Sequence, residues 1–453
     1  MAESKSDLFL RTYNANYIRT FRRDELDQLR TTINNSTDFK EGEKRTLLRL
    51  IDSRPYSLPR TIWGPNHFYV ARKNGMNIYL FGESHMKTER EILRNCISSI
   101  GSQTPPPDFK KFVDVLKDLE TSGKCFFDVF TEFDYIKDRE RTEIINYDIS
   151  LSYTMNSIID KYKHCLTKNT RNNHCNNFRF HYSDVRTFLY TLFGFFEFPQ
   201  FQTVDQVLRF YSDKPFQQNL FREFGNYDSN RWIFHSFILD NPLVKKQLEK
   251  SYLKIHIKRY IGFMIQSYIT PEIVFAFRIF NEVLNCNVAH EVGLVLRMYS
   301  KIYGFMLALL ALSMDTYLLS RLFKLYDMTK DIDYRGPDRT YNAIIYSGWM
   351  HIINIKNFLQ LALGFQIDEI YVPLNENSSC IQISNQDQRS NILNYRPVVD
   401  PSPFDDLPEQ FIYVENAFDY SRYLREGKIE RPLYKPEYLP DLIYRAPESK
   451  STI

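Results

Sequence analysis

The sequence predicts an α/β protein with a mixed, mainly parallel central sheet flanked by helices, a large helical insertion and an extended proline-rich C-terminal arm. Short apolar runs alternate with amphipathic, helix-like stretches in the first 185 residues and again after residue 340. This alternation is typical of strands and helices that build one layered sheet. The intervening residues 186–340 carry Phe, Tyr, Leu and Met at helical spacing with few strand signals, which indicates the insertion.

Residues 1–60 are polar and amphipathic, and we expect them to form a helical N-terminal segment. The next two runs, HFYVARK (67–73) and MNIYLFG (76–82), have the composition of strands. Asn74-Gly75 joins them, and this dipeptide is a strong signal for a tight hairpin. The second strand should therefore have an antiparallel neighbour.

A helix should follow the second strand, because Thr88 and Glu91 form a T-x-x-E capping box and apolar residues then recur at helical spacing. The run DFKKFVDVLKDLE (108–120) predicts a further helix. Two more strands are expected at 124–130 and 178–182, where apolar runs end in polar residues.

After the insertion, residues 342–346 predict a strand, and 353–363 predict a helix. Two late strands are expected at 369–373 and 380–384. From residue 395 onward eight prolines interrupt the chain, which favours an extended arm. The predicted organisation is an N-terminal helical segment (1–60), the first half of the α/β core (61–185), the helical insertion or subdomain (186–340), the second half of the core (341–394) and the C-terminal arm (395–453).

Composition and charge argue against several classes of protein. The chain of 453 residues has 43% hydrophobic and 25% charged residues, and its net charge of +3 comes without a basic cluster. We therefore expect no specific nucleic-acid partner. The N-terminus lacks an apolar leader, and the longest apolar run, 302–312, is shorter than the ~20 residues of a membrane span. These features predict a cytoplasmic protein without a transmembrane segment.

Six cysteines occur without a CxxC motif, at positions 96, 125, 165, 175, 286 and 380. We expect most of them to be reduced thiols of an intracellular protein. His164-Cys165 and His174-Cys175 stand out because they lie in one polar stretch. Three interpretations of this stretch remain open: a zinc loop, a Cys165–Cys175 disulfide in an oxidising setting or a virion, and two unlinked thiols.

Polar side chains that can carry chemistry recur where the predicted strands end. Glu83 and His85 follow one strand, Glu132 and Asp184 follow two others, and His351 follows the strand after the insertion. Sites in α/β sheets form outside the carboxyl ends of the strands, so we expect these residues to converge. Two imidazoles with two or three carboxylates suit a divalent metal such as Mn, Co, Zn or Fe. They also suit a metal-free general base with an orienting carboxylate.

Glycines and arginines complete the candidate site. Gly82 and Gly348 each begin a G-x-x-H motif, and they would let the backbone turn sharply or a ligand come close. Arg90 is a candidate for binding an anionic transition state. Asp184 and Arg186 are included for their position alone, and a helix cap with a solvated Arg186 is the alternative interpretation.

The segments G-E-S-H (82–85), Glu132 and G-W-M-H (348–351) resemble, in this order, the motifs of the superfamily that groups TIKI/TraB proteins, ChaN-like proteins and erythromycin esterases. Members carry an N-terminal G-x-x-H or G-E-x-H, a Glu after a later strand and a C-terminal G-x-x-H. The G-E-S-H form fits the ChaN-like pattern, whereas erythromycin esterases carry G-E-x-x-H. The match covers three short motifs, and the helical insertion has no counterpart.

The resemblance implies an α/β fold and a metal-dependent hydrolase that acts on a peptide or ester bond. TIKI members are metal-dependent peptidases, whereas erythromycin esterases use the His and Glu without a firm need for a metal. By this resemblance His85 and His351 would be metal ligands or the base. Glu83 would be a ligand or an orienting carboxylate, and Glu132 the general base or a further ligand.

A second hypothesis is a catalytically inactive scaffold on the same fold. The aromatic-rich insertion and the C-terminal arm would then dock protein partners in an assembly such as a virion. The bias toward Asn, Ile and aromatic residues, together with the insertion, also resembles proteins of giant DNA viruses. For such a protein the expected location is the host cytoplasm or the virion.

Overall fold

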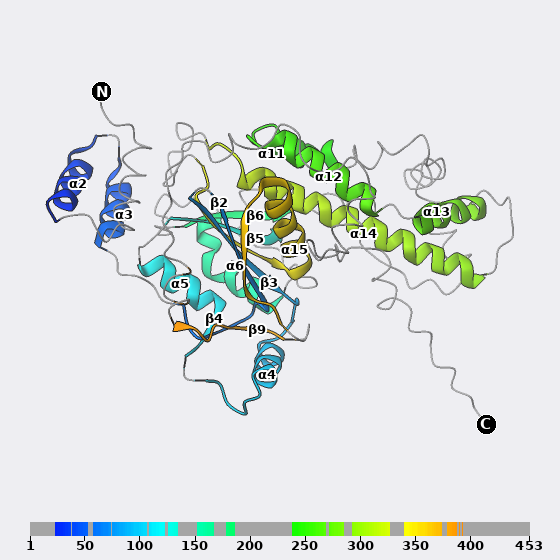
Figure 1. Cartoon of the computed structure of the whole chain (residues 1–453), viewed down its shortest axis with the longest axis horizontal. Helices are drawn as coiled ribbons and strands as arrows, with labels where there is room; N and C mark the ends of the chain where they lie inside the picture. Colours follow the sequence, from blue (N-terminus) through cyan, green and yellow to red (C-terminus); the bar gives the residue numbers. More distant parts are fainter. Residues whose placement is uncertain are drawn as a thin grey trace. The chain divides into compact units, whose positions relative to one another are not determined.

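The computed structural model (Figure 1) describes most of the predicted core and part of the insertion. The chain divides into two compact units, one formed by Met1–Asp184 and Leu322–Phe411, the other by Val185–Arg321 and Ile412–Ile453. The described residues are 23–37, 39–52, 58–73, 75–106, 108–122, 126–134, 152–166, 178–185, 238–268, 271–284, 292–326, 339–373, 378–386, 389 and 392. The predicted arm, 395–453, and Cys175 lie outside them.

A six-stranded sheet forms the centre of the first unit. Its order is β6 (Phe178–Asp184), β5 (Phe127–Asp134), β7 (Asn342–Gly348), β3 (Met76–Glu83), β2 (His67–Lys73) and β8 (Gln366–Tyr371). Strands β3, β5, β6 and β7 run parallel to one another, whereas β2 is antiparallel to both β3 and β8. The predicted mixed, mainly parallel sheet of an α/β protein is confirmed.

The β2–β3 hairpin also forms as predicted, with Lys73 opposite Met76 and His67 opposite Gly82. Gly75 in the turn has a φ of +85°, a left-handed conformation that glycine adopts without steric cost. Every residue of β3 is buried. This burial explains the continuous apolar run in its sequence, because a strand with two paired neighbours and both faces covered has no solvent side.

Helices cover both faces of this sheet. One face carries a continuous apolar core to which α2 (Arg23–Asn35), α3 (Glu41–Asp52), α5 (Phe112–Ser122) and α6 (Tyr153–Leu166) contribute. The helix α15 (Trp349–Asn357), continued by the π-helical turn η2 (Phe358–Ala362), packs against β2, β3 and β7. Each large apolar side chain buried in this way contributes about 1.5–3 kcal/mol, so the sheet and its helices supply the main stabilisation of the unit.

A second, three-stranded sheet has the order β4 (Phe109–Lys111), β1 (Thr61–Trp63) and β9 (Cys380–Gln382). The helix predicted over 108–120 is wrong at its start. Residues Phe109–Lys111 form β4 and pair in parallel with β1, and the helix begins only at Phe112. Phe109 stacks on Trp63 with 6.0 Å between the ring centroids. This contact joins segments that are distant in sequence, and local helical periodicity does not reveal it.

Helix α4 (Glu89–Ser99) begins as the capping box predicts. The Glu91 amide donates to Thr88 Oγ1 at 3.2 Å, and the Lys87 amide donates to Glu91 Oε2 at 3.3 Å. The first bond satisfies one of the amides that a helix start leaves without an intrahelical partner, and the second holds the residue before the N-cap.

The described part of the second unit is helical. Its helices are α11 (Pro242–Leu248), α12 (Lys254–Tyr268), α13 (Pro271–Leu284) and α14 (Val292–Leu322). Within the described residues α14 is the one helix long and apolar enough to cross a membrane, and most of its apolar window is buried inside the structure. Its buried Ser313 and Thr316 donate to the carbonyls of Leu309 and Leu312 at 2.9 and 2.6 Å, so these hydroxyls are satisfied within the helix itself.

A buried charged cluster links β5 to β6. Arg179 Nη2 donates to Asp128 Oδ2 at 2.8 Å, and His181 Nε2 lies 2.8 Å from Asp128 Oδ1. Burial alone would raise the pKa of the Asp128 carboxyl, but the Arg179 guanidinium and the His181 imidazole outweigh it and hold this pKa below 3.8. Asp128 therefore stays ionised inside the core, and both partners are needed to offset the cost of burying its charge.

We expect Arg179→Met to lower the free energy of unfolding at neutral pH by about 3–5 kcal/mol, because it leaves the Asp128 charge buried without its main partner. The loss should shrink as the pH falls below 3.8, where wild type itself loses the contribution of a carboxyl with a depressed pKa. Urea unfolding at several pH values measures both effects. Lys110→Met, which removes a half-exposed pair with Asp118 at 2.7 Å, is the control and should cost less than about 1 kcal/mol. An equal loss of unfolding free energy in both variants would contradict the role of Arg179 as the main partner of the buried Asp128 charge.

Candidate active site

The two G-x-x-H motifs lie side by side because β3 and β7 are neighbours in the sheet. Their parallel register places Glu83 opposite Gly348, at the carboxyl ends of both strands. On the other side of β7, Thr131 of β5 is paired with Tyr346, which brings the neighbouring Glu132 to the same end. The structure therefore brings together Glu83, His85, Glu132 and His351.

Glu83 and His85 form a carboxylate–imidazole pair. The Nδ1 atom of His85 lies 3.2 Å from Oε1 of Glu83. The Glu83 side chain is 2% exposed and that of His85 is 39% exposed, so a buried carboxylate supports an accessible imidazole. His85 has a φ of +51°, the one positive value at a non-glycine residue in the described chain. Backbone strain of this kind costs about 1–3 kcal/mol and persists only where the surroundings impose it.

Tyr346 fixes the second oxygen of Glu83. Its buried hydroxyl donates to Glu83 Oε2 at 2.6 Å. Burial and the charge of Glu83 raise the pKa of Tyr346 well above 10, so the hydroxyl keeps its proton and remains a donor at every physiological pH. One oxygen of Glu83 is thereby held and the other faces His85. Sequence reasoning missed this role of Tyr346, which is simply the last residue of the strand predicted over 342–346.

Glu132 occupies the space between the two histidines. Its Oε2 atom accepts hydrogen bonds from the Ser347 hydroxyl and the Gly348 amide, each at 2.7 Å. Its Oε1 atom lies 3.4 Å from Nε2 of His351, and Oε2 lies 3.9 Å from Nε2 of His85. The Gly348 amide belongs to the N-cap of α15, where the helix dipole favours a negative charge. The buried Glu132 carboxylate is thus satisfied by Ser347 and by Gly348, the first residue of the second motif.

The position of Glu132 within its strand differs from the prediction. The sequence predicts that the strand ends before Glu132, whereas β5 continues to Asp134. The register between β5 and β6 shifts between Thr131 and Asp134. Such irregularities redirect side chains near sheet ends, and a pattern of apolar residues does not show them. His351 likewise lies in the first turn of α15 and not in the loop before it.

The two motif glycines let β3, β7 and the His85 loop, residues 84–88, approach closely. A Cβ atom on Gly348 would overlap His85 Nε2 and lie 3.4 Å from Glu132 Oε2. A Cβ atom on Gly82 would lie 2.9 Å from the Cα of Trp349. The absence of a side chain at these two glycines therefore lets the two motifs touch each other.

Asn66 and His67 support the site from β2 and the turn before it. The Asn66 side-chain amide donates to Ser84 Oγ, and Asn66 Oδ1 lies 2.8 Å from His67 Nδ1. The His67 ring stacks on Trp349 with 5.4 Å between centroids. Burial, and secondly the charge of Lys356, lower the pKa of His67 to about 4, so it is neutral near pH 7. Sequence reasoning missed both residues, since their only signal is adjacency to the hairpin.

The remaining predicted residues lie elsewhere or cannot be placed. Arg90 is exposed on α4, and among the described residues no contact joins it to the four converging side chains. Asp184 is buried at the end of β6, opposite Asp134 of β5. Arg186 lies outside the described residues.

The donor types of the four side chains suit a divalent metal. Within the described chain, no three or more His, Cys, Asp or Glu side chains are placed so that they could hold a metal ion. Glu83 and Glu132 each have one oxygen that accepts hydrogen bonds from residues 346–348, at the carboxyl end of β7. The four side chains form a polar network whose members hold one another.

We expect Gly348→Ala to displace the His85 ring, because the added methyl group occupies the space of Nε2. NMR spectra of the imidazole groups should show a large shift of the His85 signals, with the far-UV circular dichroism unchanged. Gly101→Ala is the control, because a Cβ atom there meets nothing within 4 Å. Any effect of this variant comes from the φ of +65° at Gly101 and not from a side-chain contact. Unmoved His85 signals in Gly348→Ala would contradict the described packing.

Comparison of the chain with protein-family models, curated proteins and solved structures found no match. The resemblance to the TIKI/TraB, ChaN-like and erythromycin esterase group therefore rests on the three motifs alone. The functional argument depends on the geometry of the site.

Proposed function

We propose that the protein is a hydrolase in which His85 activates water for attack on a peptide or ester carbonyl. The observation that carries this proposal is the 3.2 Å contact between a buried carboxylate of Glu83 and a half-exposed imidazole of His85. A carboxylate behind an imidazole orients the ring and stabilises its protonated form, as general base catalysis requires.

The reaction would proceed through groups of the chain itself. Water attacks the carbonyl carbon while one of its protons moves to Nε2 of His85, the ring nitrogen that faces away from Glu83 and lies beside Gly348, 3.9 Å from Glu132 Oε2. The Glu83 carboxylate stabilises the resulting imidazolium through Nδ1. His85 then returns the proton to the departing amine or alcohol as the C–N or C–O bond breaks. Tyr346 acts as a positioning residue, because it holds Glu83 in the orientation that this sequence needs.

Glu132 and His351 would position the second motif. Glu132 holds the Gly348 amide and the Ser347 hydroxyl, and His351 lies 3.4 Å from its other oxygen. Backbone amides at helix starts can stabilise an oxyanion. The Gly348 amide binds Glu132, and the amides of Lys87 and Glu91 bind the capping box, so these donors are engaged. We therefore assign the oxyanion contact to none of them.

A divalent metal is the second version of the proposal. Glu83, His85, Glu132 and His351 would be its ligands, and it would supply Lewis-acid activation of the water. The side chains as placed do not form a ligand set. For this reason we assign the proton transfers to the side chains and treat the metal as a separate test.

We expect His85→Ala to lower kcat/KM by at least ~100-fold on p-nitrophenyl esters or fluorogenic peptides, because general base catalysis contributes about 10²–10⁴-fold. Glu83→Gln should lower it less, since the imidazole remains. His256→Ala, a histidine of α12, is the matched control and should retain full activity. Full activity in folded His85→Ala would eliminate the assigned base. Absence of turnover in wild type would favour the inactive scaffold.

Elemental mass spectrometry of wild type, His85→Ala and His351→Ala separates the two versions. The side-chain version predicts active wild type with less than stoichiometric Mn, Co, Zn or Fe, and activity that survives chelation. Stoichiometric metal that is lost in both variants would overturn it in favour of the metal version.

A further inference from the structure

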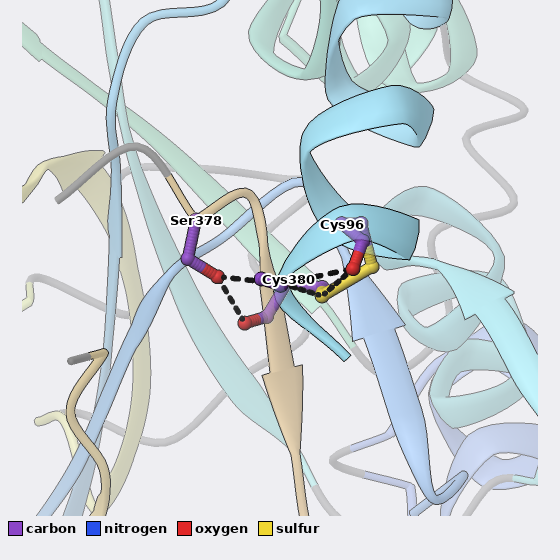
Figure 2. The surroundings of a disulfide bond; sticks show 4 residues. Cys96, Ser378 and Cys380 are labelled. Carbon is purple, nitrogen blue, oxygen red and sulfur yellow. Dashed lines mark hydrogen bonds between the residues drawn. A yellow bond between two sulfur atoms is a disulfide. The ribbon is translucent and has the colours of Figure 1, made fainter. Parts of the chain in front are cut away.

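A disulfide joins two segments that are far apart in sequence. Cys96 of α4 and Cys380 of β9 are linked across 284 residues, with their Cα atoms 5.2 Å apart (Figure 2). Both residues are completely buried. The sequence predicts reduced thiols for most cysteines, and this pair has no spacing signal that would have distinguished it.

The disulfide contributes much of the attachment of α4. This helix begins directly after the His85 loop and packs mainly on β1 and β9 of the small sheet. Its apolar side belongs to a small cluster, separate from the main core, whose buried members are Trp63, Ile92, Cys96 and Cys380. Five partly buried side chains pack against them: Met86, Leu93, Ile100, Phe109 and Tyr153. Half of the four buried members are the disulfide itself. Apart from Cys96, Ile92 is the one described side chain of α4 that is fully buried, so the apolar contacts that remain after reduction are mostly partly buried ones.

Non-covalent contacts also hold α4 at both ends. At its last turn the Ser378 hydroxyl donates to Ser99 Oγ at 3.2 Å. An ion pair and a hydrogen bond lie at its first turn. Glu89 contacts Lys111 Nζ at 2.7 Å and accepts from the Tyr153 hydroxyl at 2.5 Å. The Glu89 and Lys111 side chains are 40% and 35% exposed, so water and salt screen this pair. The covalent link is the strongest of these anchors.

We propose that the Cys96–Cys380 disulfide is a redox-sensitive clamp that holds α4 and, through it, the His85 loop in the conformation of the candidate site. His85 adopts a backbone conformation that its neighbours must impose. The site contacts of His85 and the hydrogen bond from the Tyr153 amide to the Met86 carbonyl, at 2.9 Å, supply part of this constraint, and the helix that follows supplies the rest while its far end is fixed. Reduction would release α4 and let His85 leave its position beside Glu83.

The chemistry of the clamp is thiol–disulfide exchange. Two thiol groups of a reductant supply two electrons and two protons, the S–S bond breaks, and the products are two cysteine thiols and the disulfide of the reductant. The surroundings accommodate both states. Ser99 Oγ lies 3.5 Å from Cys380 Sγ. Cys380 Sγ also lies 3.7 Å from the Cys96 carbonyl, which a thiol proton could reach (Figure 2). Because both cysteines are buried, the reductant reaches them only when α4 opens.

The first measurement is peptide mapping of the full-length protein, purified with N-ethylmaleimide and without reductant. We expect one peptide pair that contains Cys96 and Cys380 and separates on reduction. Hydrogen exchange is then followed in oxidised wild type, in dithiothreitol-reduced wild type and in Cys96→Ser/Cys380→Ser. Loss of the bond should accelerate exchange in α4 and the His85 loop roughly 10-fold or more, with β3 and β7 unchanged.

Ser98→Ala, on the exposed side of α4, is the matched control and should exchange like oxidised wild type. Oxidised glutathione should restore slow exchange in reduced wild type and have no effect on the double variant. If the double variant does not fold, reduced wild type alone gives the answer. Absence of the linked peptides, or unchanged exchange after the bond is shown by mass to be reduced, would overturn the proposal.

Only the consequence for catalysis rests on the proposed function. Hydrolysis measured in parallel should fall on reduction and recover on reoxidation. Hydrolysis absent in both states would count against the hydrolase, while hydrogen exchange would still decide whether the clamp exists.

Discussion

The parallel pairing of β3 with β7 is the interaction on which the candidate site depends. It joins segments more than 260 residues apart and sets Glu83 opposite Gly348. A shift of one residue in this register would turn every side chain of one strand to the opposite face of the sheet. The Glu83–Tyr346 hydrogen bond and the contact of His85 with Gly348 would then be lost together. The apolar run of β3, buried along its whole length, supplies the energy that holds the register.

Burial of charge is the second constraint. Glu83 and Glu132 are each about 2% exposed, and an isolated buried carboxylate would be strongly destabilising. Each is satisfied by donors of β7 or its end: the Tyr346 hydroxyl for Glu83, the Ser347 hydroxyl and Gly348 amide for Glu132. The remaining oxygens face imidazoles. The same bonds that make burial tolerable therefore also orient the groups proposed to carry the reaction.

The α/β class, the hairpin and the convergence of both G-x-x-H motifs follow from local patterns: alternation of strands and helices, Asn74-Gly75, and polar residues after apolar runs. The rest depends on contacts between distant segments. The strand β4 forms because β1 lies beside it, β5 continues past Glu132 through an irregular register, and Cys96 finds Cys380 only in the folded chain. A tyrosine is a common residue in strands, so the sequence does not single out Tyr346. Only its hydrogen bond to Glu83 reveals that it positions this carboxylate.

The claim that both motifs form one site is tested most directly by a nuclear Overhauser measurement on protein with labelled histidine rings and labelled glycine α-carbons. The position where Gly348 would carry a Cβ atom faces Nε2 of His85, so one glycine α-hydrogen points at the ring. The structure predicts a cross-peak between the His85 ring and the α-hydrogens of Gly348. A His85 ring that shows cross-peaks only within its own segment, in protein that is folded, would contradict the convergence and with it the proposed site.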